Sequence, residues 1–240
     1  RDVAPSRGLG DVYKRQPNEE KLFIWNITQS IKRDTTVMDK QISYPWREEN
    51  GGAPYYLMFL KDENTLITEL QSFPLNDKEA TLPAYQKRTL DTNKLLKSFS
   101  SYKKSIRNDE ASILPESFFY SNDAIKPDGT KVVQAMVHLA QLNILDLETG
   151  HVSGYRLEGE PDFSVFKSDE KIKSYFTRVQ ADDNYIYAVY WGKERWERFE
   201  TPHMNIIHVY DWDGNLVQKI ETDYSICLLY TSPSPRDGAT

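Results

Sequence analysis

Short runs of apolar residues alternate along the chain with turns rich in Asp, Asn and Gly. These turn residues tolerate the positive φ angles of tight turns, whereas β-branched and aromatic residues favour strands. The pattern therefore predicts a series of β-hairpins. One kind of hairpin has its turn within FLKDENTLI, AIKPDGTKVV and VQADDNYIYAVY. A second kind has its turn within YQKRTLDTNKLLKSF, LNILDLETGHVSGYRL and IIHVYDWDGNLVQKI.

The two kinds of hairpin alternate, so each repeating unit supplies four strands. Asp91, Asp146 and Asp211 mark the second turn of successive units and lie 55 and 65 residues apart. The predicted strands of the three units are 56–60, 65–70, 85–90 and 95–100, then 118–122, 132–138, 142–147 and 152–157, then 175–180, 185–190, 205–210 and 216–221. Residues 22–27 and 35–41 are expected to be the last two strands of an earlier unit, and 223–226 to begin another.

Four-stranded units in tandem predict an all-β fold. We expect a partial β-propeller of four-stranded antiparallel blades, with about three complete blades plus parts of two. The long apolar run 132–147 also suits a buried helix. Its resemblance to the flanking hairpins and its Val and Ile content favour two strands.

The two ends of the chain are related through DNA. Codons can be chosen for residues 3–16 so that the opposite strand, read one base out of frame, encodes residues 227–240 in full. Two native protein segments have no physical reason to encode each other, and the DNA resembles a transposon-end sequencing adapter. We therefore expect residues 1–16 and 227–240 to be non-native adapter translation and residues 17–226 to be the partial propeller.

Composition excludes several functions. The formal net charge is −6, which argues against binding to nucleic acid or to anionic membrane surfaces. The single cysteine, Cys227, lies in the expected adapter, so residues 17–226 offer no thiol catalysis, disulfide or Cys-ligated zinc. No apolar run approaches the roughly 20 residues that cross a bilayer, so no transmembrane segment is predicted.

The segments YFTRVQADDNYIYAVYWG and NIIHVYDWDGNLVQKIE resemble a blade of the TolB-like six-bladed propeller proteins of Bacteroidetes. LNILDLETG and FLKDENTLI are similar to the corresponding turns of neighbouring blades. The resemblance implies a closed six-bladed ring, exported or lipid-anchored in the cell envelope, without an established catalytic role. The three whole and two partial blades expected here would be a fragment of such a ring, with exposed sheet edges.

The candidate ligand-binding residues lie in the longest insertion on one predicted loop face, WGKERWERFETPHM. Trp191, Arg195, Trp196 and His203 can form an aromatic and cationic clamp for a sugar or peptide, because aromatic planes stack on apolar faces and Arg supplies forked donors. The same aromatic residues can instead pack beneath the loop and cap the blade.

Other candidate sites have simpler explanations. A second loop on the same face carries four acids that calcium could use or that water could solvate: Glu158, Glu160, Asp162 and Asp169. The four histidines show no metal-ligand spacing: His138, His151, His203 and His208. The sequence lacks a nucleophile elbow, a His-Glu-x-x-His pair and a phosphate-binding glycine loop. No metal, cofactor or catalytic residue is therefore predicted.

The sequence leaves three functions open. The first is a non-catalytic binding or scaffold propeller of the bacterial cell envelope, with a protein, peptide or glycan partner. The second is a propeller hydrolase or lyase with a metal or carboxylate site in the central channel, for which Glu116, Asp123 and Asp182 are candidates. The third is a purely structural domain. Because a fold does not fix a function, the first reading rests partly on analogy.

Overall fold

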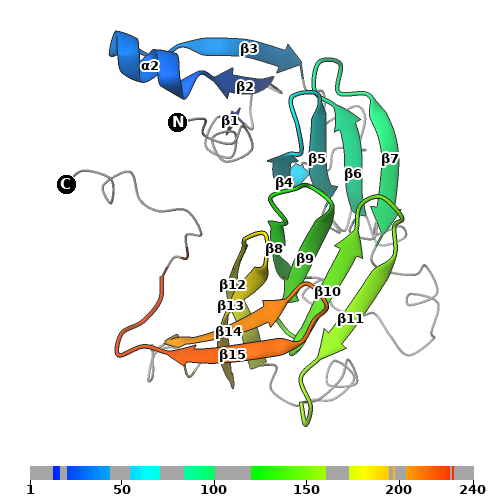
Figure 1. The fold of residues 1–240 in the computed structure, drawn as a ribbon, viewed down its shortest axis with the longest axis vertical. Helices are drawn as coiled ribbons and strands as arrows, with labels where there is room; N and C mark the ends of the chain where they lie inside the picture. The colour runs from blue at the N-terminus through cyan, green and yellow to red at the C-terminus, as the bar shows by residue number, and fades with distance from the viewer. Residues whose placement is uncertain are drawn as a thin grey trace. The chain divides into compact units, whose positions relative to one another are not determined.

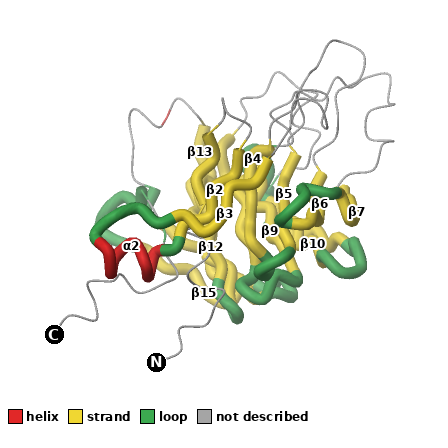
Figure 2. Tube along the Cα trace, turned by 90° about the horizontal axis from the view of Figure 1, so that it is seen from above, coloured by secondary structure: helices red, strands yellow, loops and turns green. Residues whose placement is uncertain are grey.

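The computed structural model describes residues 13–16, 21–43, 55–70, 84–100, 120–160, 173–194, 197, 204–227 and 229. The chain divides into two compact units, Arg1–Ser100 and Ser101–Thr240, which we describe separately. Strands dominate the described residues of both units (Figures 1 and 2). No helix in these ranges is long and apolar enough to cross a membrane.

The first unit opens with a three-stranded antiparallel sheet of β1 (Tyr13–Gln16), β2 (Lys21–Trp25) and β3 (Met38–Ser43). A short helix, α2 (Ile27–Arg33), joins β2 to β3 (Figure 2). This helix was not predicted from the sequence, where the preceding strand was expected to run to Ile27. Asn26 begins the helix, because its side-chain oxygen accepts a hydrogen bond of 2.9 Å from the backbone N–H of Gln29.

The next four strands form one antiparallel sheet in chain order: β4 (Tyr55–Leu60), β5 (Thr65–Leu70), β6 (Ala84–Thr89) and β7 (Leu95–Ser100). Its bounds agree closely with the predicted first complete blade. The core of this unit joins the two sheets through Ile24, Ile42, Met58, Leu66 and Leu90.

The second unit contains two further four-stranded antiparallel sheets (Figure 1). One consists of β8 (Ser121–Ile125), β9 (Lys131–Met136), β10 (Gln141–Asp146) and β11 (Val152–Arg156). The other consists of β12 (Lys173–Ala181), β13 (Tyr185–Glu194), β14 (Ile206–Asp211) and β15 (Leu216–Glu221). The run 132–147 is thus two strands and not a helix, and the predicted all-β, partial-propeller fold is confirmed.

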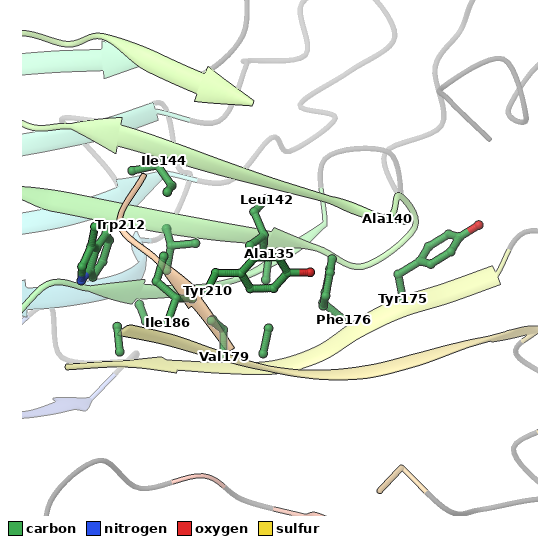
Figure 3. Packing of buried hydrophobic residues seen from close by; sticks show 14 residues of the cluster. Ala135, Ala140, Leu142, Ile144, Tyr175, Phe176, Val179, Ile186, Tyr210 and Trp212 are labelled. Carbon is green, nitrogen blue, oxygen red and sulfur yellow. The ribbon is translucent and has the colours of Figure 1, made fainter. Parts of the chain in front are cut away.

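The two sheets of the second unit pack face to face through alternate residues of their strands. Figure 3 shows side chains from both sheets pointing toward one another, with Trp212 at one end of the cluster and Tyr175 at the other. The first strands also lie together, since Asn122 Nδ2 donates to the carbonyl of Phe176 at 3.0 Å. Adjacent inner strands and packed blade faces are the expected geometry of neighbouring propeller blades.

Several predicted strands differ from those observed, and the last strand before the first complete blade, expected at 35–41, is found at Met38–Ser43. The predicted strand 118–122 is found at Ser121–Ile125, where polar side chains on one face hide the strand pattern. β13 continues to Glu194, so the start of the predicted insertion belongs to a strand. Residues 223–226 lie in no strand, although the backbone N–H of Ile226 donates to Met204 O at 2.8 Å.

The second turn of each blade has a similar arrangement of hydrogen bonds in the three blades. In the second and third blades, Asp146 and Asp211 each accept backbone N–H bonds from the following residues. In the first blade Thr89 takes this position, because its N–H donates to Lys94 O as that of Asp146 donates to His151 O. Asp91, the marker used in the sequence, instead forms an ion pair with Lys40 at 2.8 Å.

Candidate functional site

Two loops leave the second unit from the same edge of the sheet β12–β15. β12 begins at Lys173 and β13 ends at Glu194, and these two residues are paired in the antiparallel register. The segment between β11 and β12 therefore enters the sheet beside the point where the segment between β13 and β14 leaves it. This edge of the sheet is the candidate site. The two loops that were predicted to share one face both attach to the sheet here.

The structure describes one of the four predicted ligand-binding residues. Trp191 lies within β13, not in a loop, and is 6% exposed. Its indole N–H finds no hydrogen-bond partner among the described residues. Arg195, Trp196 and His203 lie outside the described residues.

Glu160 ties the segment after β11 to the sheet at this edge. Its carboxylate accepts a hydrogen bond from the hydroxyl of Tyr175 at 3.0 Å and another from that of Tyr190 at 3.3 Å. The ammonium of Lys173 lies 3.9 Å away and adds a weak, partly exposed ion pair. The carboxylate thus bridges β12 and β13, and it holds one loop against the base of the other.

The two tyrosines are held in their neutral form. Burial, followed by the nearby charge of Glu160, raises the pKa of Tyr190 to about 12. The pKa of Tyr175 is raised further above its usual value by burial and by its hydrogen bond to Glu160. Both hydroxyls therefore remain donors to the carboxylate at neutral pH.

A buried histidine lies behind Tyr190. The ring of His208 stacks on that of Tyr190 with centroids 4.4 Å apart and an interplanar angle of 11°. Its Nδ1 lies 3.1 Å from the hydroxyl of Tyr210. Burial, assisted by the positive charge of Lys219, lowers the pKa of His208 to about 4. The imidazole is therefore neutral, and it acts as a packed and hydrogen-bonded core residue.

The remaining sequence candidates are not brought together. Of the four loop acids, Glu160 is engaged as described and Glu158 is exposed, while Asp162 and Asp169 lie outside the described residues. His138 Nδ1 lies 3.2 Å from Lys173 O, and His151 is exposed beside Ser153. Across the described ranges, no group of three or more His, Cys, Asp or Glu residues is placed to hold a metal ion.

The proposed central-channel acids have separate roles. Asp182 closes its own β12–β13 turn, where it accepts hydrogen bonds from the N–H groups of Asn184 and Tyr185. It also accepts one from the hydroxyl of Tyr187 at 2.8 Å. Asp123 lies on β8, and Glu116 is outside the described residues.

Sequence reasoning missed the cluster of Glu160, Tyr175, Tyr190 and His208. One signal was present: Tyr190 and His208 occupy the core-facing positions of adjacent strands, as the alternation of each strand indicates. The partnership with Glu160 carries no such signal, because it depends on how the segment after β11 turns back onto the sheet.

The family of the chain follows from its own residues. A family model described as TolB-like 6-blade propeller-like matches residues 68–231, from within β5 to beyond β15. The chain belongs to the TolB-like propeller family. This confirms the family part of the resemblance seen in the sequence.

Solved structures with similar folds are distant in sequence. They include a protein from Lactobacillus plantarum, with 16% identity and a TM-score of 0.42 over 88% of this chain and 54% of the other. Hydrazine synthase of Kuenenia stuttgartiensis has 11% identity and a TM-score of 0.42 over 88% and 53%. The RRP9 WD40 repeats have 7% identity and a TM-score of 0.41 over 71% and 39%. This TolB-like chain thus spans about half or less of each, and no curated protein matches it.

Proposed function

We propose that this TolB-like chain is a non-catalytic binding scaffold of the bacterial cell envelope. It would hold a protein, peptide or glycan partner on the loop face beside Lys173 and Glu194. The observation that carries the proposal is the pairing of these two residues, because it brings both loops to one edge of one blade. Propellers commonly combine a rigid array of sheets with loops that differ in length and sequence.

Glu160 supports this proposal from within the scaffold. A binding loop keeps more affinity when its base is ordered before the partner arrives, since less conformational freedom is lost on association. The bonds from Tyr175 and Tyr190 hold Glu160, where the first loop begins, and β13 runs to Glu194, where the second loop begins. Arg195 and Trp196 follow directly, and Arg and Trp are among the residue types that dominate binding hot spots, while His203 lies later in the same loop.

Arrays of immobilised glycans and peptides, probed with the purified chain, test this function. We expect selective binding to one class of probe, and we expect Trp196→Ala to weaken it. Tyr185→Ala is the control, because Tyr185 is a partly exposed aromatic residue at the end of β13 opposite to Glu194 and the loops. If Trp196→Ala and a Gly/Ser replacement of residues 195–203 both left the bound signal unchanged, the role assigned to this loop would be wrong.

The envelope location and a source within Bacteroidetes are part of this proposal and rest on the family resemblance. Fractionation of cells that express the tagged gene in its native host tests the location. Recovery in the periplasmic or membrane-anchored fraction is expected, and recovery with the cytosolic markers would contradict it.

We also propose that residues 1–16 and 227–240 are translated adapter. The support is their relation through opposite DNA strands. The pairing of β1 with β2 is compatible with this origin, because strand pairing uses backbone groups that any sequence supplies. Sequencing the genomic locus should show native codons diverging from this chain before Pro17 and after Ile226, and agreement through either end would contradict the proposal.

A further inference from the structure

A row of polar side chains crosses the sheet β8–β11 on the face opposite to its apolar core. The register places Asp123, Gln134 and Asn143 directly opposite one another on β8, β9 and β10. Ser121 and Gln141 lie two residues along on the same face, since side chains alternate along a strand. We call these five residues the polar seam. It is unusual because Gln134 is fully buried and Ser121 and Asn143 are nearly so.

The outer half of the polar seam is complete within the protein. Gln141 Nε2 donates to Asn143 Oδ1 at 2.7 Å, and Asn143 Nδ2 lies 3.5 Å from the sulfur of Met136. Gly154 on β11 leaves room for the hydrogen bond between Gln141 and Asn143, because a Cβ at this position would lie 3.3 Å from Gln141 Nε2. The side-chain amide of Asn143 thus has a partner at each end.

The inner half lacks such partners. Among the residues that the structure describes, neither Nε2 nor Oε1 of Gln134 has a hydrogen-bond partner, and neither does Oγ of Ser121. Three polar atoms of two residues on neighbouring strands are therefore buried together without protein partners. A buried amide or hydroxyl in that condition destabilises a fold, so native proteins rarely retain one.

We propose that the inner half of the polar seam is a binding site for ordered water between β8 and β9. The amide of Gln134 requires an acceptor for Nε2 and a donor for Oε1 at once. A metal cation cannot accept from Nε2, and an anion would be repelled by the carboxylate of Asp123. Water supplies donors and acceptors, and it is small enough for a fully buried site lined by several polar groups.

The proposed water site accounts for the polar residues of β8. Ser121 and Asp123 make the strand look like a loop in the sequence, yet they occupy regular strand positions. Bound water would act as a structural bridge between β8 and β9, independent of the loop face proposed above to bind a partner. The failure of one proposal therefore leaves the other standing.

A crystal structure of the chain at a resolution that shows water, together with chemical unfolding, tests the site. We expect ordered density within hydrogen-bond distance of Gln134 Nε2 and Oε1. We also expect Gln134→Met to lower the unfolding midpoint, because it removes the groups that hold the water. Gln218→Met, at an exposed position on β15, is the matched control and should leave the midpoint unchanged.

Two results would overturn the proposal. One is a dry site, with no density near the amide of Gln134. The other is an unchanged or raised midpoint for Gln134→Met, which is expected if the amide is buried unsatisfied and its removal relieves the fold. Should Gln134→Met fail to fold, Ser121→Ala replaces it with a smaller change. A lower midpoint again supports the site, and an unchanged or higher one overturns it.

Discussion

The imidazole of His208 lies almost parallel to the ring of Tyr190, with ring centroids 4.4 Å apart, and the hydroxyl of Tyr190 donates a hydrogen bond to Glu160. A single chain of contacts therefore runs from the core of the blade to the base of a surface loop. His208 belongs to β14, Tyr190 to β13 and Glu160 to the segment after β11. The arrangement gives the loop face a rigid foundation, and it leads to the following predictions.

Replacement of His208 by Phe should remove a pH dependence of stability. The pKa of His208 is about 4 in the folded chain and about 6.5 when unfolded, so the unfolded state binds more protons between these values. The stabilisation is fully present above about pH 6.5 and is lost as the pH falls toward about 4, by on the order of 2–3 kcal/mol. Phe keeps the stacked ring but cannot titrate.

The measurement is the free energy of unfolding by urea across this pH range for both proteins. Carboxylates titrate in the same window, so the difference between the two curves is the informative quantity. Parallel curves for the native chain and His208→Phe would show that His208 does not gain a proton on unfolding.

Glu160→Gln should loosen the loop after β11. The substitution preserves the shape of the side chain but removes the charge, and hydrogen bonds to charged groups are stronger, so a loss of about 1–2 kcal/mol is expected. Hydrogen exchange at the amides of Leu157–Glu160 should accelerate. Glu158→Gln removes the same charge at an exposed position of the same loop and should change neither quantity. If the two substitutions had equal effects, the change in stability and exchange would come from the lost charge alone and not from the hydrogen bonds of Glu160.

Gly214→Ala should destabilise the chain more than Gly159→Ala. The two glycines have φ angles of 82° and 81°, so Ala is equally strained at both positions. A Cβ at Gly159 would meet nothing within 4 Å, whereas one at Gly214 would overlap the ring of Tyr155 on β11. We expect losses of about 1 kcal/mol for Gly159→Ala and about 2–4 kcal/mol for Gly214→Ala.

Thermal or urea unfolding of both variants checks this difference. A second substitution, Tyr155→Ala, should reduce the additional cost of Gly214→Ala, because it removes the ring that the new methyl group meets. If the two Gly→Ala variants lost equal stability, the close contact between the β14–β15 turn and β11 would be absent in solution.

Trp212→Ala should be among the most destabilising single substitutions in the second unit. Trp212 is buried in the core between the two sheets, and its indole N–H donates to Asp182 O at 3.1 Å. Removal of a large buried aromatic side chain costs about 3–5 kcal/mol. Trp212→Phe retains most of the packing and should cost about 1–2 kcal/mol, mainly through the lost hydrogen bond. If Trp212→Ala lost less stability than Trp212→Phe, this packing of Trp212 would be contradicted.

The sequence predicted the fold better than the site, for physical reasons. Strands such as Leu95–Ser100 and Leu216–Glu221 were located to the residue, because tight turns and alternation are local properties. β8 was displaced because the polar seam removes its apolar alternation. α2 was missed because its beginning depends on one capping bond from Gln29 to Asn26.

The candidate site depends on contacts that the sequence pattern does not contain. Trp191 was assigned to a loop because the predicted strand ended at Tyr190, yet β13 continues through Trp191 to Glu194. The role of Glu160 requires residues from three segments to meet. Turn equivalence was also obscured, since Thr89 replaces the Asp of the later blades and Asp91 lies two residues away.

The most direct test of the proposed binding scaffold measures the affinity of the purified chain for the probe that it selects on the glycan and peptide arrays. Isothermal titration would compare the native chain with Trp196→Ala, Glu160→Gln and the control Tyr185→Ala. The account predicts about a tenfold or greater loss of affinity for Trp196→Ala, since hot-spot residues contribute about 2 kcal/mol or more, with a smaller loss for Glu160→Gln. Affinity unchanged in both variants, or lost equally in Tyr185→Ala, would contradict it.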